Sequence, residues 1–431
     1  MMKKSLKEII AEAQQASTWL AHRKASRQIN EQFTSGEAEP KASLKVAFVS
    51  SCAVDPLVDC MVVQAAACGI SLQTHIAPFG QVSQEILNPE SGLYTFGADV
   101  TVLMAEANSL SSNPQEAAGE LIKLSQSWQE KGTGILVVCT FMTPPDWPLH
   151  LLETEKQIEL NQANHQLKET FKENPRVEIC DLASLAAYYG YANAMSPEMM
   201  AMARIPFAEG FLSLLSRKLV SHLKAQAGMI RKCLVLDCDN TLWGGIIGED
   251  GIDGISLGPD WPGREFVDFQ KAILELYEQG VILAINSKNN EADVMQVLRE
   301  HPHMILKEEH FAAIRVNWDT KPDNMKLIAD EVNIGIDTFV FVDDNPAERQ
   351  MMGQMLPEVA VLDLPANPAL YATVLRETNL FAKASLTEED KKRGQMYAAQ
   401  RQRTQLEKTS ISLEDYLKSL EMICSIRPAE E

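Results

Sequence analysis

Short, fully apolar segments alternate with helical patterns twice along this chain, and this alternation constrains the fold more than any other feature. The first half contains five apolar segments of strand length, at residues 44–49, 72–76, 100–104, 135–139 and 177–180. Helical patterns lie between them, the longest at residues 114–129 and 151–172. Strands that are apolar on both faces and separated by helices predict a parallel sheet covered by helices on both sides.

A second alternation begins at residue 233. Its expected strands are residues 233–236, 281–285, 304–306, 338–342 and 359–362, and its expected helices are residues 264–279, 291–300, 324–332 and 347–356. A chain of 431 residues is too long for one hydrophobic core. We therefore expect an α/β protein with two doubly wound, Rossmann-like parallel sheets. The expected domains are a helical arm and linker over 1–43, α/β domains over 44–227 and 228–385, and a helical tail over 386–431.

The composition narrows the class of protein. Acidic residues outnumber basic ones by 59 to 39, which gives a formal net charge of −20 at pH 7. A surface this negative repels phosphate backbones and anionic membranes, so we expect neither nucleic acid nor a membrane as a partner. The eight cysteines form no C-x-x-C pair or zinc spacing, and no signal peptide or membrane-spanning run is evident. These features predict a cytoplasmic protein with free thiols.

Two aspartates directly after an expected strand give the sharpest functional signal. In the segment DCDNTL, Asp237 and Asp239 follow residues 233–236. Alternate residues of an extended backbone point the same way, and ligands of open parallel sheets bind beyond the carboxyl ends of the strands. Two close carboxylates are unfavourable unless a cation lies between them or one is protonated. The pair therefore predicts a divalent cation with oxygen ligands, Mg²⁺ by preference.

Further polar residues lie at the ends of other expected elements. Ser287 follows one strand, Lys321 begins a helix, and Asp343 and Asp344 follow another strand. Together they add a hydroxyl, a cation and more carboxylates to the same edge of the sheet. Phosphoryl transfer needs such a set of nucleophile, acid and base, hydrogen-bond donors and positive charge.

Simpler interpretations exist for the same residues. Ser287 suits a helix cap before residue 291, and Lys321 on its own suits a solvated lysine. Asp344 suits a solvated or capping carboxylate as well as a metal ligand. Cys238 alternates away from the crevice, so we interpret it as a packed core thiol.

The order D-x-D-x-T, serine, lysine and D-D resembles the haloacid-dehalogenase (HAD) superfamily of phosphotransferases. The segments CLVLDCDNTLWGGIIGEDG, VILAINSKNNEADV, FAAIRVNWDTKPDN and FVFVDDNPAER are similar to its FkbH-like family (subfamily IIIC). The resemblance implies that Asp237 attacks phosphorus and forms an aspartyl-phosphate, and that Asp239 acts as general acid and then as general base. It also implies that Thr241, Ser287 and Lys321 contact the phosphate.

The resemblance further implies that Mg²⁺ is the cofactor. Asp237, Asp343 and the backbone carbonyl of Asp239 would hold it, with Asp344 as an outer ligand. Many members of the superfamily carry a cap domain, but the connections here are short. Seven glycines lie between Thr241 and residue 264, so we expect a flexible flap, a minimal cap and a crevice that is open or is covered by the first domain.

The first half resembles the SGNH-hydrolase fold. Ser50 and Ser51 follow its first strand, Gly80 its second and Asn108 its third. Hydrolases of this type need an Asp-x-x-His pair, and no histidine of this chain has an aspartate three residues before it. We therefore expect a binding or docking role for this domain, and Ser51 and Asn108 are only weak candidates for chemistry.

For the whole chain, the FkbH-like resemblance implies loading of a glyceryl unit from an acyl phosphate onto an acyl-carrier protein, with loss of phosphate. A plain phosphatase of a small phosphorylated metabolite and a scaffold without catalysis stay open as alternatives. A phosphorylated receiver domain is excluded, because its acidic pair comes first and its lysine last, whereas here D-x-D-x-T leads and Lys321 precedes Asp343.

Overall fold

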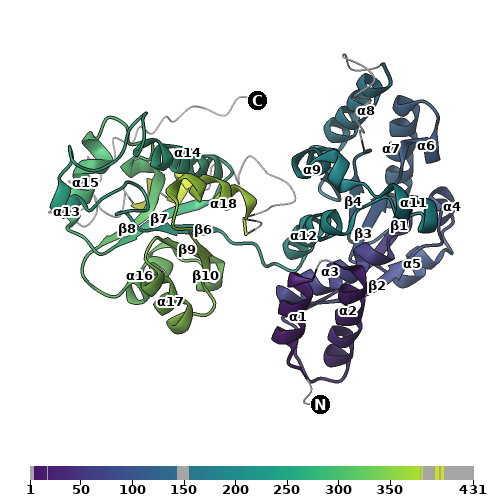
Figure 1. The fold of residues 1–431 in the computed structure, drawn as a ribbon, viewed down its shortest axis with the longest axis horizontal. Helices are drawn as coiled ribbons and strands as arrows, with labels where there is room; N and C mark the ends of the chain where they lie inside the picture. The colour runs from purple at the N-terminus through teal and green to yellow at the C-terminus, as the bar shows by residue number, and fades with distance from the viewer. Residues whose placement is uncertain are drawn as a thin grey trace, which may run out of the picture. The chain divides into compact units, whose positions relative to one another are not determined.

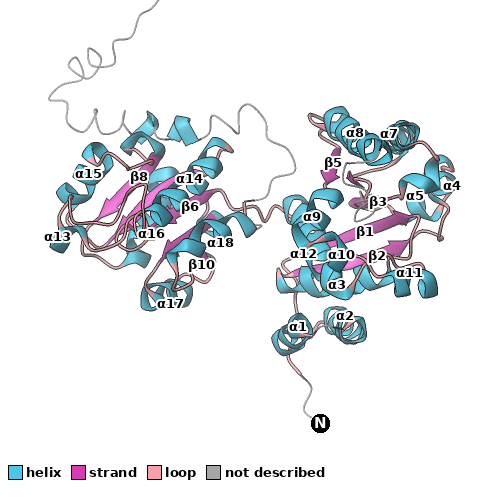
Figure 2. Cartoon of the chain, turned by 45° about the horizontal axis from the view of Figure 1, so that its top comes forward, coloured by secondary structure: helices cyan, strands magenta, loops and turns pink. Residues whose placement is uncertain are grey.

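The computed structural model describes residues 4–16, 18–142, 155–378, 380–381, 394–397 and 399–401. The chain divides into two compact units between Met229 and Ile230. Each unit contains one five-stranded parallel sheet between layers of helices, as Figures 1 and 2 show. The predicted fold class of two doubly wound parallel sheets is thus confirmed. The expected helical tail over 386–431 lies outside the described residues, apart from the helical residues 394–397 and 399–401.

The first unit has the strand order β2-β1-β3-β4-β5. Its strands are β1 (Ala42–Ser50), β2 (Ile70–Ile76), β3 (Val100–Met104), β4 (Ile135–Cys139) and β5 (Val177–Cys180). Its helices are α1 (Leu6–Gln15), α2 (Trp19–Thr34), α3 (Asp55–Ala67), α4 (Val82–Leu87), α5 (Gly92–Phe96), α6 (Ala107–Leu110), α7 (Pro114–Lys131), α8 (Glu155–Phe171), α9 (Leu182–Tyr189), α10 (Tyr191–Ala194), α11 (Pro197–Ala203) and α12 (Glu209–Gln226).

The core of the first unit lies on both faces of this sheet. Val46 and Phe48 of β1 pack with α3 and α12, whereas Ala47 and Val49 pack with α7 on the opposite face. Helices α1 and α2 belong to the first of these cores, to which they contribute buried residues such as Ile29. The residues expected to form an arm are therefore folded onto the unit.

The second unit has the strand order β10-β9-β6-β7-β8. Its strands are β6 (Cys233–Leu236), β7 (Ile282–Ser287), β8 (Phe311–Val316), β9 (Phe339–Asp343) and β10 (Ala360–Asp363). Its helices are α13 (Ile247–Asp250), α14 (Arg264–Glu278), α15 (Glu291–Glu300), α16 (Lys321–Val332), α17 (Pro346–Met355) and α18 (Tyr371–Glu377), with 3₁₀ turns at Glu308–His310, Ile336–Thr338 and Pro368–Leu370. Helices α14, α15 and α18 cover one face, and α16 and α17 cover the other.

One predicted strand is wrong. Residues 304–306 form no strand. The strand that pairs with β7 at that edge of the sheet is β8. The apolar side chains of Met304 and Leu306 are buried in the core, which explains their strand-like pattern. Their backbone is satisfied differently, because the side-chain oxygen of Gln270 accepts hydrogen bonds from the amides of Ile305 and Leu306 at 2.8 and 3.1 Å.

The glycine-rich segment after β6 is not the loose flap that we expected. Gly244 and Ser256 exchange two backbone hydrogen bonds of 3.0 and 2.7 Å, and Ile255 is buried in the core. The glycines serve tight turns and close approaches: Gly245 has a φ of +95°, and a Cβ at Gly254 would lie 2.1 Å from the carbonyl oxygen of Asp250. No further domain is inserted into the described part of the second unit, in agreement with a minimal cap.

Candidate active site

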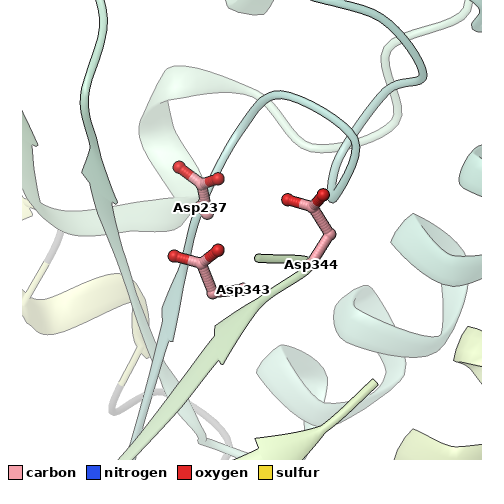
Figure 3. Close-up of side chains that lie close together, drawn as sticks. All are labelled: Asp237, Asp343 and Asp344. Carbon is pink, nitrogen blue, oxygen red and sulfur yellow. The ribbon is translucent and has the colours of Figure 1, made fainter. Parts of the chain in front are cut away.

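Three carboxylates meet at the carboxyl ends of β6 and β9. Asp237 follows β6, Asp343 ends β9, and Asp344 comes next in the chain. The two strands pair directly, and the Asp237 amide donates a 3.0 Å hydrogen bond to the carbonyl of Val342. One oxygen from each carboxylate lies within 4.8 Å of the others, and Figure 3 shows the side chains facing a common space.

Lys321 is the cation of this cluster. It is the first residue of α16, which Thr320 caps with its hydroxyl and in which Pro322 occupies the first turn. Its Nζ lies 2.9 Å from Asp237 Oδ1 and 2.5 Å from Asp343 Oδ2, and the residue is only 3% exposed. Burial disfavours the charged amine, but the two carboxylates outweigh this effect and raise the pKa of Lys321. The solvated-lysine interpretation is therefore wrong.

The cluster is short of positive charge. Burial and the nearby Asp237 raise the pKa of Asp343 to about 6, although Lys321 and the amide of Asn345 act in the opposite direction. Burial and Asp237 also raise the pKa of Asp344. Three carboxylates thus share the Lys321 ammonium group, with Arg349 as a weaker positive influence on Asp344. Carboxylate oxygens are the ligands that hard divalent cations prefer. The donor set fits the predicted Mg²⁺ ion.

Asp239 faces a different set of partners. Its Oδ1 accepts hydrogen bonds from Trp243 Nε1 at 2.9 Å and from the Ile247 amide at 3.1 Å, and its Oδ2 accepts one from Asn289 Nδ2 at 2.8 Å. Burial raises the pKa of Asp239 and, with the nearby charge of Asp237, outweighs the three hydrogen bonds. This carboxyl therefore holds a proton more readily than an exposed aspartate, as a general acid must.

Thr241 and Ser287 carry buried hydroxyls, and that of Ser287 lies against the Cys238 thiol. Thr241 is fully buried, and its Oγ1 accepts a 3.2 Å hydrogen bond from the amide of Asp344. Ser287 is the last residue of β7, whose strand lies beside β6, and it is 2% exposed. The alternative of Ser287 as a helix cap is wrong, because the Asn290 side chain caps α15. Cys238 is buried in the core, which confirms its interpretation as a packed thiol.

Sequence reasoning missed the residues that hold these groups in place. Arg349 Nη1 donates hydrogen bonds to the carbonyls of Asp343 and Asp344, each at 2.7 Å, and Nη2 donates one to Asp363 at 2.9 Å. The arginine thereby fixes the turn that carries two of the three carboxylates. The sequence does carry a signal for this role of Arg349, which is its position in the segment FVFVDDNPAER. An arginine one turn into a helix can reach back to the loop before the helix. Asn289, which donates a hydrogen bond to Asp239, was also missed.

Comparisons with known proteins include an extensive similarity to a solved structure. No protein-family model and no curated protein matches this chain. Among solved structures, it is similar to the N-terminal part of protein BF1531 from Bacteroides fragilis, a crystal structure that contains a phosphatase domain complexed with Mg. The two share 28% identity and a TM-score of 0.74, over 89% of this chain and 100% of that chain.

A second solved structure is similar over a smaller part. It is the C-terminal catalytic domain of peptidoglycan O-acetyltransferase A from Streptococcus pneumoniae, with 13% identity and a TM-score of 0.30, over 43% of this chain and 96% of that chain. None of the described helices is long and apolar enough to span a membrane.

Proposed function

We propose that the second unit is a Mg²⁺-dependent phosphatase of the HAD type, with Asp237 as the nucleophile. The observation that carries the proposal is the buried Lys321 ammonium between Asp237 and Asp343, with Asp344 completing the carboxylate cluster. The similarity to a phosphatase domain complexed with Mg supports the same conclusion. The order of the motifs along the chain supports the assignment to the superfamily.

In this proposal Asp237, Asp343 and Asp344 hold the metal, together with the backbone carbonyl of Asp239. A bound Mg²⁺ ion supplies a Lewis acid that withdraws charge from the phosphoryl oxygens. Arg349 holds the turn at Asp343 and Asp344 through their carbonyls, so that both carboxylates face Asp237.

The chain's own residues account for the covalent steps. The Asp237 carboxylate attacks phosphorus, the bond between phosphorus and the leaving oxygen breaks, and Asp239 gives its proton to that oxygen. Asp239 then takes a proton from water as the water attacks the aspartyl-phosphate, which releases inorganic phosphate and restores Asp237. The Thr241 and Ser287 hydroxyls and the Lys321 ammonium bind the phosphoryl oxygens and balance their charge.

The finer part of the proposal concerns the substrate and the acceptor. We propose an acyl phosphate of the glyceryl type as substrate and an acyl-carrier protein as acceptor. In this transfer the thiol of the carrier attacks the acyl carbon, the bond between that carbon and the phosphate oxygen breaks, and inorganic phosphate leaves. Attack of Asp237 on phosphorus would release the free acid instead, so the two routes compete for the same bound substrate. The supporting observation is that no domain is inserted over the sheet edge in the described part of the second unit, which suits a tethered acceptor. The plain-phosphatase alternative uses the same residues, with water as the only acceptor.

The test is phosphate release by the full chain from acetyl phosphate and from p-nitrophenyl phosphate, with MgCl₂ and with EDTA. We expect release that needs Mg²⁺, and a loss of about a hundredfold or more in kcat/KM for Asp237→Asn. The matched control is Asp330→Asn, which removes an exposed carboxylate of the same unit and should leave the rate unchanged. Full activity of Asp237→Asn, or release that EDTA does not affect, would refute the proposal.

The acceptor is tested separately. Acetyl transfer to an added acyl-carrier protein, detected by mass spectrometry, would support the proposal that a carrier protein is the acceptor. Release from both substrates without transfer would favour the plain phosphatase.

A further inference from the structure

The first unit contains a cavity that the proposed phosphatase chemistry does not use. It has a volume of about 330 Å³ and lies beyond the carboxyl ends of β1, β3 and β4, where Cys52, Met104 and Thr140 line it. The strand order β2-β1-β3-β4-β5 reverses between β1 and β3. Ligands of open α/β sheets bind at such a reversal, and the volume lies within the range of ligand pockets. The location and the size both indicate a binding site.

The lining of the cavity is mainly apolar and comes from several elements. Four methionines contribute to it, from β3, from the segment after β4, from the residues just before α11, and from α11 itself: Met104, Met142, Met195 and Met200. Leu182 and Phe207 are buried beside them. Methionine side chains are unbranched and adapt their shape to what they enclose. A flexible, unbranched apolar chain is the ligand that suits such a lining.

Among the lining residues that the structure describes, acidic and basic side chains balance each other. The exposed residues Glu106, Asn108 and Lys156 supply one carboxylate, one amide and one ammonium group. The buried Thr140 hydroxyl is already engaged, because it donates to Asp181 at 3.2 Å and accepts from the Ala183 amide at 3.1 Å. A neutral head group with hydrogen-bonding capacity therefore matches the polar part better than an ion does.

The described part of the lining lacks the groups that hydrolysis needs. Ser51 does not line it, and its hydroxyl accepts a 2.8 Å hydrogen bond from the Glu106 amide. Ser50 accepts one of 3.1 Å from the Cys52 amide. Among the described residues that line the cavity there is no histidine to activate a serine or the Cys52 thiol. Burial raises the pKa of Cys52 to about 11, so this thiol stays protonated.

We infer that this cavity reversibly binds an unbranched apolar chain that ends in a neutral polar group. The inference goes beyond the proposed function, because it concerns the first unit and involves no covalent step. Octanamide is a suitable probe, with an apolar tail and an uncharged head. A ligand of this size in a preformed pocket should bind with a Kd of about 1 mM or tighter.

The experiment measures binding of octanamide to the full chain by isothermal titration calorimetry and ligand-observed NMR. Ala107→Trp places a large side chain at the cavity from the first residue of α6. The matched control is Ala203→Trp, which adds the same volume at an exposed position lining a neighbouring hollow. We expect Ala107→Trp to weaken binding at least tenfold and Ala203→Trp to leave it unchanged. Acetamide, which has the head group alone, should not bind in the same range.

The outcomes separate the possibilities. Saturable octanamide binding that is lost in Ala107→Trp and kept in Ala203→Trp supports the inference. Absence of saturable binding to the wild-type chain overturns it, as does equal binding by both variants. Tighter binding of octanoate than of octanamide would overturn the assignment of a neutral head group. Phosphate release and the unfolding midpoint, measured on the same samples, show whether each variant is folded.

Discussion

Replacement of Lys321 by methionine tests the electrostatic argument for the site. The methionine fills a similar volume but removes the ammonium group that lies between Asp237 and Asp343. Lys321 is 3% exposed and Asp343 is fully buried, so water cannot compensate for the lost charge. Removal of one partner from a buried ion pair destabilises a protein by about 3–5 kcal/mol. We expect a loss of this size in EDTA at about pH 8, where Asp343 is ionised.

The measurement is amide hydrogen exchange of residues 232–242, which include β6 in the centre of the sheet. Exchange from this strand reports the free energy of opening of the second unit without interference from the first. A loss of 3 kcal/mol corresponds to roughly 150-fold faster exchange. Added Mg²⁺ should recover part of the loss, because it balances the same carboxylates. Asp343→Asn in the Lys321→Met background should also recover part, because it removes one of the unpaired charges.

The control is Lys326→Met, which removes an exposed lysine of the same helix that pairs with the exposed Asp323. Such a surface pair contributes less than about 1 kcal/mol. If Lys321→Met accelerates exchange no more than Lys326→Met does, the ion pair does not stabilise the unit. If neither Mg²⁺ nor Asp343→Asn restores protection, the loss comes from packing and the electrostatic reasoning is wrong.

Three further predictions concern other groups. Arg349→Met should weaken Mg²⁺ binding about tenfold or more in calorimetry, because the turn at Asp343 loses its anchors; an unchanged Kd would contradict this. Burial disfavours a charged His222, but hydrogen bonds to Cys180 and Glu178 outweigh it and raise its pKa to about 9. Cys180, which shares this hydrogen bond, has its pKa lowered to about 5. Between about pH 6.5 and 9 the stabilisation by His222 is lost while that by Cys180 grows, so the free energy of unfolding of the first unit should change by less than about 1 kcal/mol between pH 7 and 9. Urea denaturation measures this. Cys180→Ala should give a profile that falls over the same range, because Glu178 then holds the proton on His222 without the opposing thiol, and equal profiles would contradict the pairing. Cys238→Ala should keep kcat within about threefold while stability falls by about 1–2 kcal/mol, and a loss of activity would indicate a chemical role for the thiol.

Much of the fold was predictable because the strands are apolar on both faces. Strand β6 was predicted with its observed bounds, because Cys233 to Leu236 alternate between two helical layers and leave no polar position. The failure at residues 304–306 has the opposite cause. There the side chains are buried as in a strand, but the backbone amides donate to the Gln270 side chain and not to a neighbouring strand. A hydrogen bond to a residue 35 positions away leaves no pattern in the local sequence.

The residues of the candidate site also differ in how far the sequence predicts them. Asp237, Asp343 and Ser287 lie at strand ends, so the geometry of a parallel sheet was enough to group them. Arg349 and Asn289 act on the site from a helix and a loop, and their partners depend on how those segments pack. The flexible flap expected after β6 is not found, because composition alone does not distinguish glycines that loosen a loop from glycines that allow close packing.

The segment from Asp237 to Asn240 explains how neighbouring residues take different roles. Asp237 joins the metal-binding carboxylates, and Cys238 packs into the core behind it. Asp239 then meets Trp243 and Asn289, and the backbone turns at Asn240, which has a φ of +54° and whose side chain accepts a hydrogen bond from the Gly245 amide. The two carboxyls of D-x-D thus have different partners. Asp237 lies beside the Lys321 cation, where we propose that it acts as the nucleophile, and Asp239 lies in a partly buried environment that raises its pKa. A one-residue change in the spacing would disrupt this arrangement, because the inserted residue would send one carboxyl towards the core.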